Sequence, residues 1–99
     1  MLFADKIRIL REEQQLPQRQ LAAALEIDTP MYSRIERGER PAKREQVVKL
    51  ATMFHVDQEE LLTLWLASKI FEVIKDEDNA DVALNVLQEE MIEYGKSKK

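Results

Sequence analysis

The sequence contains no cysteine, and His55 is the only histidine among its 99 residues. Without cysteine the chain can form no disulfide, no thiolate zinc site and no thiol nucleophile, which fits a protein of the reducing cytoplasm. One histidine and scattered carboxylates give neither a nucleophile–base pair nor a set of metal ligands, and no glycine-rich phosphate loop is present. We therefore predict that the protein is not an enzyme and needs no cofactor or metal.

Glycine and proline are also scarce, with two and three copies. This leaves little turn chemistry for hairpins, whereas the abundant Leu, Ala, Glu, Gln and Arg favour helices, so we predict an all-α fold. The longest apolar region, residues 61–74, is too short for a membrane span and includes Lys69 and Glu72. The N-terminal MLFADK has no apolar stretch of the kind found in a secretory signal. We therefore expect neither secretion nor a membrane partner.

The charges are unevenly distributed along the chain. Residues 1–56 hold ten Lys/Arg and eight Asp/Glu, whereas residues 57–99 hold five and eleven, which gives the overall charge of -4. Five of the 15 basic residues fall between Arg34 and Arg44. This asymmetry suggests a polyanion-facing N-terminal part, and the alternative is that both parts are ordinary solvated surfaces.

Hydrophobic periodicity and capping residues predict six helices. Phe3, Ile7 and Leu10 mark the first, and either Asp28 or Thr29 caps the third. The six helices are expected over about residues 2–14, over 18–25, from near 29 to Gly38, through 47–54 to His55, from the capping box at 57–60 onward, and from Ala80 to Gly95.

The fifth predicted helix is too apolar for one neighbour to cover. A broad arc of its helical wheel holds apolar residues, while Leu61 and Trp65 fall on the polar side among Ser68 and Lys69. A polar hinge at residues 76–79 separates it from the sixth helix.

Two short helices joined by a tight turn, with arginines flanking the second, have the outline of a helix-turn-helix. The segments KIRILREEQQLPQRQLAAALEI, YSRIERGER and VVKLATMFHVDQEELL together cover about residues 3–62. In these segments the chain resembles the Cro and phage-repressor family of helix-turn-helix DNA-binding proteins, also called the xenobiotic-response-element family. The resemblance implies a five-helix DNA-binding domain over residues 1–60 with a C-terminal helical extension.

The chain departs from the family pattern at three positions. Glu26 replaces the turn glycine, His55 stands where glycine commonly ends the fourth helix, and Lys43 replaces a capping serine. We expect Glu26 to adopt a left-handed backbone conformation, and His to be among the better-tolerated residues at position 55.

The resemblance also implies site residues, since the third helix of the family lies in the DNA major groove. The expected base contacts are Thr29, Met31, Ser33 and Arg34, with Pro30 at most touching a thymine methyl group. The expected phosphate contacts are Gln18, Arg37, Arg40, Lys43 and Arg44. The alternative for the arginines is a solvated loop with surface ion pairs to Glu36, Glu39 and Glu45.

One further pair is implied by the family. In the family, the residue at the position of Glu36 pairs with an arginine of the first helix, and the matching arginine here is Arg11. We expect a partly buried structural pair.

Such domains commonly dimerise on a two-fold symmetric operator. We therefore expect residues 61–99 to form a helical hairpin that packs against its copy in a homodimer. The alternative is that the hairpin folds back and enlarges the core of the monomer. The expected interface residues are Trp65, Ile70, Phe71, Ile74, Leu84, Leu87 and Met91.

The predicted function is a cytoplasmic transcriptional repressor or related regulator that binds double-stranded DNA at a palindromic operator. A controller protein beside a restriction-modification system is a variant of this function. The rival is an antitoxin-like or other protein-binding module that uses its acidic C-terminal helices to hold a second protein and binds DNA secondarily.

Overall fold

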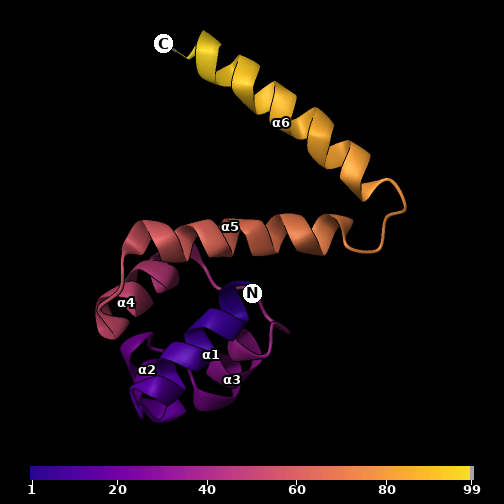
Figure 1. Cartoon of the computed structure of the whole chain (residues 1–99). Helices are drawn as coiled ribbons and strands as arrows, with labels where there is room; N and C mark the ends of the chain where they lie inside the picture. Colours follow the sequence, from indigo (N-terminus) through magenta and orange to yellow (C-terminus); the bar gives the residue numbers. More distant parts are fainter. Residues whose placement is uncertain (99) are drawn as a thin grey trace. The chain divides into compact units, whose positions relative to one another are not determined.

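The computed structural model describes residues 1–98, and these form six helices without a strand (Figure 1). The predicted all-α fold is therefore confirmed. The helices are α1 (Phe3–Glu13), α2 (Gln18–Ala24), α3 (Thr29–Glu36), α4 (Arg44–Phe54), α5 (Gln58–Ile74) and α6 (Ala80–Ser97).

Side-chain caps fix where two of these helices begin. The Asp28 carboxylate accepts a hydrogen bond from the Met31 N–H at 2.8 Å, so Asp28 rather than Thr29 caps α3. Asp57 accepts from the Glu60 N–H at 3.2 Å at the start of α5. Each contact satisfies a backbone donor that the helix itself leaves unpaired.

Left-handed backbone conformations separate several of the helices. Glu26 and His55 have φ values of 59° and 58°, which confirms the conformation predicted at the turn between α2 and α3. Gly38 ends the turn after α3 with a φ of 73°. Gln15, between α1 and α2, has a φ of 56°, which the sequence did not predict.

The end of α6 corrects one sequence prediction. The helix was expected to stop at Gly95, but it continues to Ser97. A glycine inside a helix costs only about 1 kcal/mol relative to alanine, which is too little to end a helix whose other residues favour it.

Residues Met1–Lys69 form one compact unit, and a second begins at Ile70. The core of the first unit is built from α1 to α4 together with Leu61, Leu62 and Trp65 from the start of α5. Residue 60, where we predicted the domain boundary, lies inside α5, and the first unit continues along this helix to Lys69.

Trp65 requires a correction, since we predicted it at a dimer interface. Its side chain is only 6% exposed and belongs to the core of the first unit. Almost none of its surface is left for a partner.

The second unit has the opposite character. None of the α6 residues up to Ser97 is buried, and several large apolar side chains of this unit are exposed. No helix within residues 1–98 combines the length and apolar content needed to cross a membrane.

Candidate nucleic-acid interface

Helix α3 has one buried and one exposed side. Tyr32, Ile35 and Glu36 are buried against the rest of the first unit. Thr29, Arg34 and Arg37 are exposed on the other side. On a helical wheel Arg37 lies between Thr29 and Arg34, so these side chains lie along one exposed strip of α3.

The remaining two candidate base contacts are less accessible. Met31 and Ser33 are each half-buried. On a helical wheel Ser33 lies between Thr29 and Arg37, whereas Met31 lies at the edge of the buried side. Thr29 and Ser33 therefore lie together on one part of the exposed side, and Arg34 lies on another part, nearer to Met31.

Arg37 is held by two neighbours within the chain. Its Nε donates to the Glu39 carboxylate, and its Nη1 donates to Ser33 Oγ at 3.1 Å. Both members of the ion pair are more than half exposed. An exposed pair of this kind contributes at most about 1 kcal/mol, so it would be released readily to an incoming phosphate.

The other basic residues of this region lack such partners. Within residues 1–98, no carboxylate lies within 4.0 Å of the charged groups of Arg34, Arg40, Lys43 or Arg44. The alternative was a loop whose arginines form ion pairs with Glu36, Glu39 and Glu45. Among the described residues of this loop, only Arg37 forms such a pair, with Glu39. Four cations remain available to an external anion.

Behind α3, Arg11 and Glu36 form the predicted ion pair. Arg11 Nε and Nη2 donate to the two oxygens of the Glu36 carboxylate at 2.6 and 3.0 Å, and Nη1 donates to the Leu16 carbonyl at 3.0 Å. The Glu36 side chain is 2% exposed and that of Arg11 is 16% exposed. This two-pronged geometry is among the stronger polar contacts in proteins.

Gln18 joins the same network, although we predicted it as a phosphate contact. Its Nε2 donates to Glu36 Oε1 at 3.2 Å. A carboxamide nitrogen has two hydrogens, so one donor and the amide oxygen remain for another partner. The network ties the start of α2 to α1 and α3.

The environment of Glu36 lowers the pKa of its carboxyl group. Burial opposes ionisation, but hydrogen bonds from neighbours, chiefly Arg11, together with the charge of Arg11, outweigh it. Tyr32 is also buried, and its burial raises the pKa of its hydroxyl, with a smaller contribution in the same direction from the nearby Glu36. Its hydroxyl has no partner of regular hydrogen-bond geometry among the described residues.

The pKa of Glu36 predicts how stability depends on pH. Because the folded pKa is depressed, the stabilisation is complete above the unfolded pKa of about 4.3 and is lost as pH falls through the folded value. We expect the free energy of unfolding, measured by urea denaturation between pH 7 and 3, to fall more steeply for the wild type than for Glu36→Gln. Parallel curves would contradict this.

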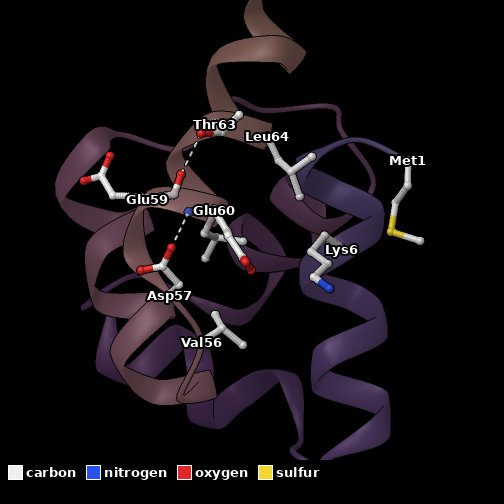
Figure 2. A pocket seen from close by; sticks show the side chains of 9 residues that line it. Met1, Lys6, Val56, Asp57, Glu59, Glu60, Thr63 and Leu64 are labelled. Atoms are coloured by element: carbon white, nitrogen blue, oxygen red, sulfur yellow. Dashed lines mark hydrogen bonds between the residues drawn. The ribbon is translucent and has the colours of Figure 1, made fainter.

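A separate cavity of about 480 Å³ lies between α1 and the start of α5 (Figure 2). Two of its polar groups serve the first turns of α5, since Asp57 caps the helix and the Thr63 hydroxyl donates to the Glu59 carbonyl at 2.7 Å. None of the candidate DNA-binding residues lines it. The lining residues are Met1, Lys6, Val56, Asp57, Glu59, Glu60, Leu61, Thr63 and Leu64.

The sequence analysis did not predict the contact between Lys69 and Trp65, in which Lys69 Nζ lies 4.0 Å from the centroid of the Trp65 ring. The spacing of four residues between an aromatic and a basic residue on one helix was the available signal.

Comparison with known protein families gives a match over residues 2–64 to the family model described as a helix-turn-helix domain. No significant match was found among curated proteins or among solved structures.

Proposed function

Because this chain belongs to the helix-turn-helix domain family, within the Cro and phage-repressor group of DNA-binding domains, we propose that it is a sequence-specific regulator of transcription. In this proposal α3 enters the major groove and its exposed strip meets the base edges. The connection after α3 and the start of α4 follow the phosphate backbone.

The observation that supports this best is the placement of unpaired cations. Arg34 stands on the exposed strip of α3, and Arg40, Lys43 and Arg44 follow it without a carboxylate partner in the described chain. The acidic residues elsewhere do not prevent DNA binding, because screening at physiological salt acts over about 8 Å.

We further propose that the protein acts as a homodimer. Apolar residues are exposed along α6 and at the end of α5, and Leu84, Leu87 and Met91 share one face of α6 because they are three or four residues apart. An exposed apolar face of this kind marks an interaction site. A second copy is the partner that a two-fold symmetric operator requires. The exposed residues are Leu66, Ile70, Phe71 and Val73 on α5, and Val82, Leu84, Val86, Leu87, Met91, Ile92 and Tyr94 on α6.

The proposed dimer occupies a palindromic operator in the cytoplasm and represses transcription there. The same exposed helices also support the rival function, in which a different protein covers them and DNA binding is secondary.

Selection of bound sequences from a random pool of duplex DNA tests the proposal. Recovery of a palindrome whose half-sites are one helical turn apart, roughly 34 Å, is the expected result. Uniformly weak binding without an enriched sequence would favour the protein-binding module.

Arg34→Ala is expected to relax sequence preference, because arginine reads guanine through O6 and N7 with two hydrogen bonds. The loss on the selected site should be about 1–3 kcal/mol, with a smaller loss on random DNA, measured by fluorescence anisotropy of labelled duplexes. Arg8→Ala is the control, since Arg8 is an exposed arginine of α1 that pairs with Asp5 at 3.4 Å. Equal losses on both DNAs would indicate that Arg34 contacts the phosphate backbone of the DNA and not a base.

A further inference from the structure

Trp65 connects α5 to the segment that leads from α3 into α4. Its indole Nε1 donates to the Ala42 carbonyl at 2.7 Å, and this contact is buried. Ala42 is itself buried and immediately precedes Lys43 and Arg44. The hydrogen bond therefore fixes the backbone that presents these two cations.

Two positive charges also lie close to the ring of Trp65. Arg44 Cζ is 5.2 Å and Lys69 Nζ is 4.0 Å from the ring centroid. Both distances are within the range in which an aromatic face attracts a cation. Among residues 1–98, neither of the two cations has a carboxylate within 4.0 Å. Both charges therefore remain available to an external anion.

We propose that Lys69 and Arg44, held over Trp65, form a binding site for a phosphate of the DNA backbone, with Trp65 as the positioning residue. The inference rests on the proposed function and extends the DNA-contacting surface from the α3–α4 connection onto α5. Arg44 follows Lys43 in the row of unpaired cations, so the anion that best fits the site is the one already proposed for its neighbours. Lys69 adds a contact that the helix-turn-helix itself does not contain.

The salt dependence of DNA binding by the full-length chain tests Lys69 directly. Each phosphate contact contributes about 0.9 to the slope of log K against log salt concentration. Lys69→Gln should reduce the magnitude of the slope by about that amount and weaken binding to selected and random duplexes alike. Lys49→Gln is the matched control, since it removes the same charge from an exposed lysine of α4 that pairs with Glu26 at 4.0 Å.

Trp65 is the only tryptophan in the chain, so its fluorescence reports on the site. Addition of duplex DNA should change the Trp65 emission of the wild type and of Lys49→Gln, and the change should be smaller in Lys69→Gln. Trp65→Phe keeps an aromatic face, whereas Trp65→Leu does not. Both variants lose the Nε1 hydrogen bond to Ala42, and only Trp65→Phe keeps a ring for the two cations. The slope should therefore decrease less in Trp65→Phe than in Trp65→Leu.

The outcomes separate the two proposals. If the wild type binds DNA and Arg40→Ala lowers the slope, while Lys69→Gln leaves both the slope and the Trp65 response unchanged, this site is overturned and the proposed function stands. If the wild type binds no DNA, or if neither Arg34→Ala nor Arg40→Ala alters binding, the proposed function itself fails.

Discussion

Arg11→Met is expected to lower the free energy of unfolding by about 3 kcal/mol. Removal of one partner from a buried ion pair typically costs about 3–5 kcal/mol, because the other charge is left buried without compensation. The lower end applies because Arg11 retains some contact with solvent, whereas Glu36 has almost none. Against the total of about 5–15 kcal/mol that is usual for a small domain, the loss is large and should be evident in urea denaturation.

A double-mutant cycle with Glu36→Gln isolates the pair. In the Glu36→Gln background the buried charge is gone, so Arg11→Met should cost much less than in the wild type. Arg8→Met is the control on the same helix, and its loss should stay within about 0.5 kcal/mol as for other surface substitutions. A coupling energy near zero between Arg11 and Glu36 would show that the contact has little energetic value.

Deletion of residues 76–99 is expected to weaken binding to the palindromic site by about 10²–10⁴-fold. Two linked binding modules exceed the affinity of one by this factor, and the truncated chain would lose the helix proposed to join them. The solution mass should fall to that of a monomer in analytical ultracentrifugation. The helical signal of α1 to α5 in far-UV circular dichroism should persist, because the core of the first unit includes no residue of α6.

A full-length variant provides the control for the truncation. Leu87→Glu places a charge on an exposed apolar position of α6 and leaves the chain length unchanged. It should reproduce the loss of mass and of palindrome affinity, since burying the charge in an interface is costly. A wild type that sediments as a monomer at micromolar concentration, and binds one half-site as tightly as a palindrome, would rule out the dimer.

Most of the fold was predictable from local signals. The cap at Asp28 or Thr29, the capping box that begins at Asp57 and the glycine after α3 placed helix ends close to where the structure has them. The Arg11–Glu36 pair came from the family resemblance and not from spacing, because 25 residues separate the two side chains in sequence. Long-range polar pairs leave no periodic signal.

The role of α5 was harder to predict. The helical wheel set Leu61 and Trp65 on the polar side, yet both are buried in the first unit, whereas Ile70 and Phe71 on the broad apolar arc are exposed. Periodicity records where apolar residues fall around a helix but not which neighbouring element each one contacts. Burial of Trp65 is compatible with its polar N–H because Nε1 donates to the Ala42 carbonyl, and this contact across 23 residues could not be derived from the sequence.

The lengths of α2 and α3 have a consequence for how this domain folds. They contain seven and eight residues, whereas isolated helices shorter than about 12–15 residues are marginal in water. The turn between them requires Glu26 in a conformation that non-glycine residues disfavour. The segment proposed to read DNA is therefore not an autonomous folding unit. Its shape depends on α1, α4 and the start of α5, and any local opening of that frame would erase the recognition surface along with the core.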